Sequence, residues 1–411
     1  MAEETLDGRW FHRLQAIHAG IPARITPNNL RTERERFLSG ESENPDFSYS
    51  YIDDAGAEHK INHLISLRDD VSREEANLVV KDLYLEKIEE KINEIKLVKV
   101  SAKLQVGTKE EDLRDYVHLA ELLYEKPDTN VLASVTNFFR ENVEEIPQGL
   151  PSIFYKDQAS SYSYVAARKY FDVSADNEDD QAMSLEEVCS FFKSALQKRG
   201  LSDWRVVRKQ NQMSVVTVMK RQKKIAVSSS LGKRFTRGFL EGLVAHEVDC
   251  HVLRLENGLS SPLQLLHLGL AKHGPGEEGI ATVFEQQVTG SDRCAGAALF
   301  LASALALGVD EGGEKRNFRE VYTIMVQYFK ALYSELDSEK TAFRVCARVF
   351  QGVPAYCKGA AFLKETLYYK GNLRIRKIIE EDPTVRANFS MGRYDPANPK
   401  HVKSLELLEI I

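Results

Sequence analysis

The residues best suited to chemistry form a short run, His246-Glu247-Val248-Asp249-Cys250-His251. Neutral imidazoles are the commonest zinc ligands in proteins, and a glutamate beside one of them is placed to take a proton from metal-bound water. The run therefore indicates a zinc-dependent hydrolase in which Glu247 is the general base.

The spacing of the two histidines is unusual, because they stand five residues apart, whereas the familiar zinc-protease helix places them four apart. A regular α-helix turns by about 500° over five residues, which leaves the two imidazoles roughly 140° apart around the axis. Rings so placed do not share a tetrahedral ion. Either the helix contains a π-type bulge, or His246 pairs with the thiolate of Cys250, which stands four residues on.

A third ligand must come from another element. Glu277 and Glu278 follow Gly274-Pro275-Gly276 and lie in the first turn of a predicted helix. Acidic residues in a first turn also favour the helix dipole without any metal, so these residues alone do not identify the ligand.

The elements that must position these residues are mostly helical. Residues 1–150 show helical periodicity, and the short β-branched segments within 204–228, separated by polar turns, predict a small antiparallel sheet. Helical periodicity returns over 235–256, which contains both histidines. We therefore predict an α+β, predominantly helical fold with the sheet directly before the active-site helix. A helical N-terminal region, 1–150, is expected to pack on a catalytic core, 151–411.

The composition excludes several classes of partner. The chain has 411 residues and a net charge of −6, so it is not built to coat itself on nucleic acid or anionic lipid. Its longest apolar run, 295–309, is 15 residues long, shorter than the roughly 20 of a membrane-spanning helix. The acidic residues 1–10 lack a targeting signal, and the five cysteines have no CxxC spacing. We expect a cytoplasmic protein with reduced thiols and no membrane partner.

One segment is strongly positive although the chain as a whole is negative: residues 204–240 contain ten basic residues and no acidic one. A basic edge strand near a protease site would favour an extended, acidic substrate tail. The alternative interpretation is a solvated basic hairpin or a nucleic-acid contact. Few aromatic residues beyond Trp204 and Phe235 interrupt the segment, so no nucleic-acid partner is expected.

The central motifs together resemble a known family. HEVDCHVLRLENG (246–258), followed by GEEGIATVFEQ (276–286), is similar to the HExxxH and (Q/E)EGLA motifs of the family that contains bacterial QEGLA-motif proteins and the microtubule-associated tyrosine carboxypeptidases. Weaker matches extend the resemblance over nearly the whole chain: an early PNN, NPDFSY (44–49), RVFQG (348–352) and FLKETLYYKG (362–371).

The resemblance implies a zincin-like metallopeptidase in which His246, His251 and Glu278 bind zinc and Glu247 is the base. It also implies that the helix bulges and that Cys250 is not a ligand. The chain departs from the family pattern at Asp249 and Cys250, where other members commonly have Gly and Thr, and at Gln351, where a basic residue is expected. These departures concern the substrate range more than the metal site.

A metallocarboxypeptidase that removes a C-terminal residue, here tyrosine, from an acidic protein tail such as that of α-tubulin is the function that the resemblance implies. The alternatives are a zinc aminopeptidase or endopeptidase, and a non-catalytic binding protein of the same fold. Capture of the free C-terminal carboxylate requires a cation, and the candidates are Arg344, Arg348 and Lys364. Tyr368 could hydrogen-bond the tetrahedral intermediate. Each cation could equally be an exposed residue paired with a nearby acid.

Overall fold

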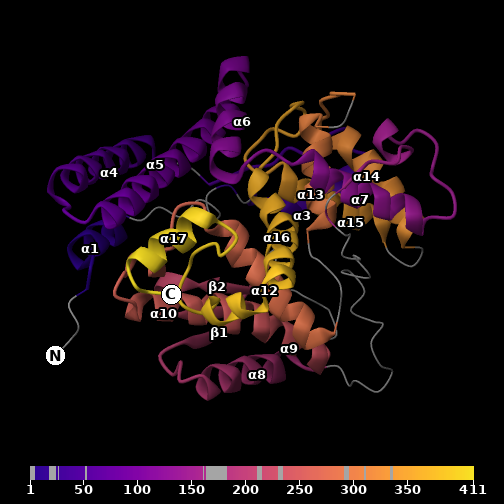
Figure 1. The fold of residues 1–411 in the computed structure, drawn as a ribbon. Coiled ribbons are helices and arrows are strands. Elements are labelled where there is room, and N and C mark those ends of the chain that lie inside the picture. Colours follow the sequence, from indigo (N-terminus) through magenta and orange to yellow (C-terminus); the bar gives the residue numbers. More distant parts are fainter. Residues whose placement is uncertain are drawn as a thin grey trace. The chain divides into compact units, whose positions relative to one another are not determined.

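The computed structural model describes residues 5–17, 25, 27–50, 53–160, 162, 183–210, 215–229, 235–290, 296–309, 312–333 and 337–411. The chain divides into two compact units (Figure 1). The unit that contains the candidate catalytic residues, called the site unit below, comprises Met1–Gly8, Val165–Ala295 and Gly371–Ile411. The other, called the helical unit, comprises Arg9–Tyr164 and Gly296–Lys370. The division at residue 150 into an N-terminal region and a catalytic core stays a prediction.

The helical unit is built from helices, and side chains cap the first residues of some of them. Asn77 accepts hydrogen bonds from the backbone N–H groups of Val79 and Val80, and Asp128 does the same at the start of a later helix. The helices are α1 (Gly8–Ile17), α3 (Leu30–Leu38), α4 (Asp54–Glu74), α5 (Leu78–Val106), α6 (Glu110–Tyr124), α7 (Thr129–Asn142), η1 (Ser152–Phe154), α13 (Ala297–Leu307), α14 (Phe318–Leu332), α15 (Ser338–Val349) and η4 (Leu363–Thr366).

The apolar run predicted to be a core helix forms α13, and nearly all of its side chains are buried. Of the helices in the described part of the chain, none combines the length and the apolar character needed to cross a membrane.

The site unit combines helices with three short strands. Its elements are α8 (Leu185–Lys198), β1 (Arg205–Lys209), β2 (Val216–Met219), η2 (Lys220–Gln222), β3 (Lys224–Ser228), α9 (Arg237–Val244), η3 (Ala245–Val252), α10 (Leu253–Ser260), α11 (Leu265–Leu268), α12 (Gly274–Thr289), η5 (Pro383–Asn388) and α17 (Pro399–Leu407), together with most of α16 (Leu367–Glu381). The described part of the chain is thus mostly helical with one small sheet, as predicted.

The sheet is mixed, so the prediction of an antiparallel sheet was wrong in part. Its strand order is β1-β3-β2, with β2 antiparallel and β1 parallel to β3. β3 is the most deeply buried strand and takes the central position, where both of its edges are paired. Only the short η2 separates β2 from β3, so these two pair as a hairpin. The more polar β1 is left to pair with the remaining edge of β3, in the parallel direction.

Two apolar cores lie on either side of η3, a π-helix. Val248 and Val252 of η3 belong to the core formed with α8, α9 and the sheet. Cys250, between them in sequence, belongs to a second core formed with α12, α16 and Phe389. Because both sides of η3 are packed, its position in the site unit is fixed by apolar burial.

Helices α12 and α16 approach each other at two glycines. A β-carbon at Gly371 would lie 2.1 Å from the carbonyl oxygen of Pro275, and one at Gly279 would lie 2.4 Å from the carbonyl oxygen of Gly371. Only glycine permits this backbone contact. The contact holds α12, the helix that carries Glu278, against α16.

We expect Gly371→Ala to lower the free energy of unfolding by about 3 kcal/mol, because the added methyl group would overlap backbone atoms that have no room to move. Gly238→Ala is the matched control, since Gly238 lies in α9 and its β-carbon would have nothing within 4 Å. The control should be neutral or stabilising by about 0.5 kcal/mol. Denaturant unfolding of both variants measures the difference, and equal stabilities would contradict the packing argument.

Candidate metal centre

The five-residue spacing of the histidines is accommodated by η3, the π-helix Ala245–Val252. In a π-turn each backbone N–H bonds to the carbonyl five residues earlier, so residues five apart stand one above the other. The rings of His246 and His251 accordingly lie on the same side, with their centroids 5.1 Å apart. The structure therefore contains the π-type bulge that the spacing predicted as one of two possibilities.

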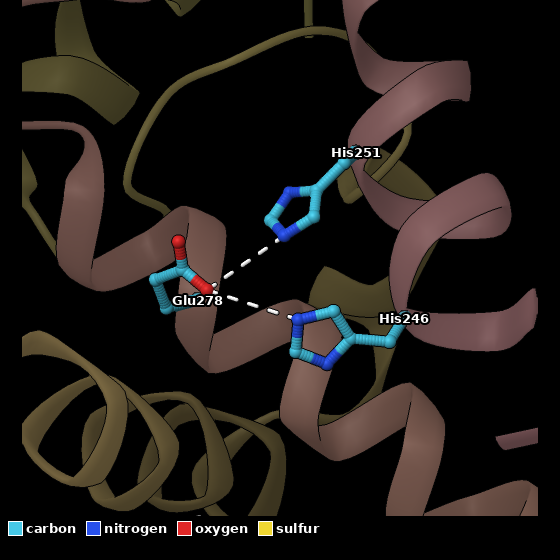
Figure 2. A group of neighbouring side chains, drawn as sticks. All are labelled: His246, His251 and Glu278. Carbon is cyan, nitrogen blue, oxygen red and sulfur yellow. Dashed lines mark ion pairs between the residues drawn. The ribbon is translucent and has the colours of Figure 1, made fainter. Parts of the chain in front are cut away.

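Glu278, in the first turns of α12, faces both histidines (Figure 2). Its Oε2 lies 3.8 Å from Nε2 of His246 and 3.7 Å from Nε2 of His251. Among the described residues, this is the only group of three His, Cys, Asp or Glu whose ligand atoms all lie within 4.8 Å of one another. Two imidazole nitrogens and one carboxylate oxygen form a donor set that suits zinc.

The Oε2 atom of Glu278 also lacks the partner that a buried carboxylate oxygen normally has. It is buried and accepts no hydrogen bond from any described residue. Burying a carboxylate oxygen without a partner costs desolvation free energy, and a cation held between this oxygen and the two Nε2 atoms would offset that free energy. These three side chains therefore fit a bound metal ion.

Each histidine is oriented by a second carboxylate. Nδ1 of His246 lies 3.1 Å from Oε2 of Glu285, and Nδ1 of His251 lies 3.0 Å from Oε1 of Glu277. Because a carboxylate accepts, Nδ1–H donates in both rings, and the lone pair of each Nε2 is left for a metal. Carboxylate partners of this kind fix the ring orientation of metal-binding histidines.

Glu277 is a buried anion held by two arginines. Arg254 donates to its Oε2 at 2.7 Å, and Arg393 donates to its Oε1 at 3.1 Å. Burial by itself would raise the pKa of Glu277, but the two guanidinium groups and His251 hold that pKa well below its usual range. The charge of Glu277 is already compensated by the two arginines, and its carboxylate accepts a hydrogen bond from His251. Glu278 is therefore the carboxylate that faces the Nε2 atoms of both histidines.

Arg393 reaches this group from the C-terminal segment. The backbone N–H of Arg393 donates to the carbonyl of Leu266, and the carbonyl of Arg393 accepts from Leu270. Its NH2 also lies 2.9 Å from Nε2 of His273. The segment after η5 therefore takes part in orienting a candidate metal ligand.

The side chain of Glu247, next to His246 on η3, makes no hydrogen bond or ion pair with any described residue. Burial raises the pKa of its carboxyl, and the neighbouring histidines offset this only in part.

Around His246, burial disfavours the charged ring, but the hydrogen bond with Glu285 and the nearby carboxylates raise the pKa of the imidazole to about 9. A metal ion would therefore displace a proton from His246.

Cys250, the alternative ligand, points away from the histidines. It lies in the core on the other side of η3, and its thiol donates to the carbonyl of Glu277 at 3.5 Å. Burial raises the pKa of this thiol well above its ordinary value, so it stays a neutral thiol.

Asp249, one of the departures from the family pattern, forms an ion pair with Arg199 just after α8. Oδ2 of Asp249 accepts from NH2 of Arg199 at 2.6 Å, and Oδ1 accepts from Nε, so the pair is bidentate. This side chain therefore ties η3 to α8.

The four residues predicted to bind substrate all lie in the helical unit. Arg344 and Arg348 are on α15, Lys364 is on η4, and Tyr368 is in the first turn of α16. Arg348 forms an ion pair with Glu365, and its guanidinium carbon lies 5.6 Å from the centre of the Tyr368 ring. Their role in substrate binding stays a prediction.

Three residues of the centre were missed by sequence reasoning. Glu285 follows Glu278 by two helical turns and Arg254 follows His251 by one, so helical spacing could have suggested both. Arg393 is 116 residues from Glu277, and no local pattern connects them.

A comparison with models of protein families matches residues 155–411 to the family described as microtubule-associated tyrosine carboxypeptidase. No curated protein matches the chain.

Replacing the two orienting carboxylates should have different effects. Glu285→Gln is expected to lower zinc affinity roughly 10–100-fold with little change in stability, because Glu285 is partly exposed and bonds to His246. Glu277→Gln should lower zinc affinity similarly and also cost about 3 kcal/mol of unfolding free energy, since two buried guanidinium groups lose their anion. Chelator competition and denaturant unfolding measure the two quantities. An unchanged stability of Glu277→Gln would contradict the charge assignment.

If Asp249 serves to hold η3, its replacement should change stability and not selectivity. We expect Asp249→Asn to cost about 1 kcal/mol of unfolding free energy, because the pair with Arg199 is partly exposed. The ratio of kcat/KM for peptides ending in tyrosine and phenylalanine should equal that of the parent protein. A changed ratio would place Asp249 in substrate selection.

Proposed function

Because the chain belongs to the microtubule-associated tyrosine carboxypeptidase family, we propose that it is a zinc carboxypeptidase that removes a C-terminal tyrosine from an acidic protein tail, such as that of α-tubulin. The family name supports a tyrosine carboxypeptidase activity on a substrate associated with microtubules. The observation that carries the zinc-dependent mechanism is the convergence of His246, His251 and the unsatisfied Oε2 of Glu278 beside Glu247.

In this proposal, Nε2 of His246, Nε2 of His251 and Oε2 of Glu278 hold the ion. Zinc bound there would polarise the scissile carbonyl and lower the pKa of a water molecule. Glu285 and Glu277 keep the two rings turned with Nε2 toward Glu278, so little reorganisation is needed when the ion binds.

Glu247 moves the proton. Its carboxylate has no partner among the described residues, so it is free to accept the proton of the attacking water and to return it to the leaving amine. The rise in its pKa caused by burial brings the carboxyl closer to the working range of a general base at neutral pH.

The sheet offers a place for an extended substrate. In the described part of the site unit, β2 is an edge strand and packs against η3, which carries Glu247. A peptide tail could add to the edge of β2 that lies opposite β3 through backbone hydrogen bonds. Lys220 and Arg221 follow β2 directly, and acidic side chains of such a tail would be attracted to them.

The basic segment is less positive than its sequence alone indicates, because acidic residues from outside it pair with several of its cations. Arg208 pairs with Glu186, and Lys223 pairs with both Asp203 and Glu256. Arg205 and Lys209 are exposed and have no ion pair among the described residues, whereas Lys233 and Arg234 lie outside the described residues. Exposed cations of this kind affect the rate at which an acidic tail associates, and the salt dependence of that rate, more than the affinity.

Mass spectrometry of a peptide ending in Glu-Glu-Tyr, incubated with the zinc-loaded chain, tests the proposal. We expect loss of one tyrosine from the free-acid peptide and none from the same peptide with an amidated C-terminus, because a carboxypeptidase requires the free carboxylate. Glu247→Gln should retain zinc and lose at least about 100-fold in rate, since the base is removed.

Glu241→Gln is the matched control, because Glu241 lies on α9 and, among the described residues, forms an ion pair only with Arg237. It should keep the parent rate. Cleavage of the amidated peptide would indicate an endopeptidase, and loss of an N-terminal residue an aminopeptidase. A chain that binds zinc and leaves every acidic tail intact would indicate a binding protein.

A further inference from the structure

A pair of histidines stands on α4 of the helical unit, outside the metal centre already described. His59 and His63 are four residues apart, and their ring centroids lie 4.0 Å apart. Residues at this spacing stand on the same face of an α-helix, one turn above the other. A regular helix therefore brings these two imidazoles together without the π-turn that His246 and His251 require.

The pair has no structural task that would account for it. The buried face of α4 is formed by Ala57, Ile61, Leu64, Leu67 and Val71, whereas His59 and His63 are exposed. Within the described ranges, neither ring has a hydrogen bond or an ion pair. Both rings can therefore turn a nitrogen toward a common ion at the cost of a side-chain rotation only.

We propose that His59 and His63 form a second metal site that takes one divalent first-row transition ion, such as Zn²⁺, through one nitrogen of each imidazole. Imidazole suits zinc, copper and nickel, whereas calcium and magnesium require oxygen ligands. The nearest acid in sequence, Glu58, forms an ion pair with Lys99 on α5. The site therefore has two protein ligands, with water completing the coordination, and binds more weakly than the three-ligand centre.

Equilibrium dialysis of the full chain against increasing free Zn²⁺ tests this site by stoichiometry and is independent of peptidase activity. The parent chain should bind two equivalents, one tightly and one more weakly. His59→Asn and His63→Asn should each lose the weaker equivalent and keep the tight one, because chelation needs both rings. The double variant should lose no more than either single variant.

His118→Asn is the matched control, because His118 is a single exposed histidine on α6 with no contact to another described histidine. It should still bind two equivalents. His246→Asn reports on the other centre, since it should lose the tight equivalent and keep the weaker one. The proposal is overturned if His59→Asn binds as many equivalents as the parent chain, or if His118→Asn loses one. Circular dichroism should show equal helicity in the His59→Asn, His63→Asn and His118→Asn variants, because these three positions are exposed.

Discussion

The candidate centre depends on a change in backbone hydrogen bonding over eight residues. Two histidines five positions apart would diverge on an α-helix, and only the π-helix Ala245–Val252 places them on one side. A π-turn is a rare conformation, so it must be stabilised by its surroundings. Here Val248 and Val252 pack into one core, Cys250 packs into another, and Asp249 is held by Arg199. Val248, Asp249 and Cys250 are therefore each held by apolar packing or an ion pair, whereas the side chain of Glu247 has no hydrogen bond or ion pair among the described residues.

Electrostatic interactions then decide which of two neighbouring carboxylates faces the Nε2 atoms of the histidines. Glu277 and Glu278 are neighbours, yet Glu277 is neutralised by Arg254 and Arg393 and bonds to His251. Glu278 has no arginine partner of this kind among the described residues, and its buried Oε2 accepts no hydrogen bond from them. The two glutamates thus have different roles. Glu277 orients a histidine, and Glu278 supplies the carboxylate whose charge a metal ion would balance. This division also gives the C-terminal segment a role, because Arg393 comes from it.

The charge of the basic segment illustrates how far composition can mislead about a surface. Ten cations within 204–240 suggest a strongly positive sheet, but their acidic partners lie in flanking elements that the count does not include. On β1, Arg205 and Lys209 are exposed and have no ion pair among the described residues. In the proposed function, such cations would raise the association rate of an acidic tail more than its affinity.

The sequence by itself determined the helical character, the position of the strands and the identity of the histidine run, because these depend on neighbours within a few residues. It also left the choice between a π-bulge and Cys250 open, since spacing cannot show which way a side chain packs. Tertiary structure decided that choice, the parallel pairing of β1 with β3, and the arginines around Glu277. The physical reason is that strand partners and buried ion pairs join residues far apart in the chain, and their energies exist only once the cores on both sides of η3 have formed.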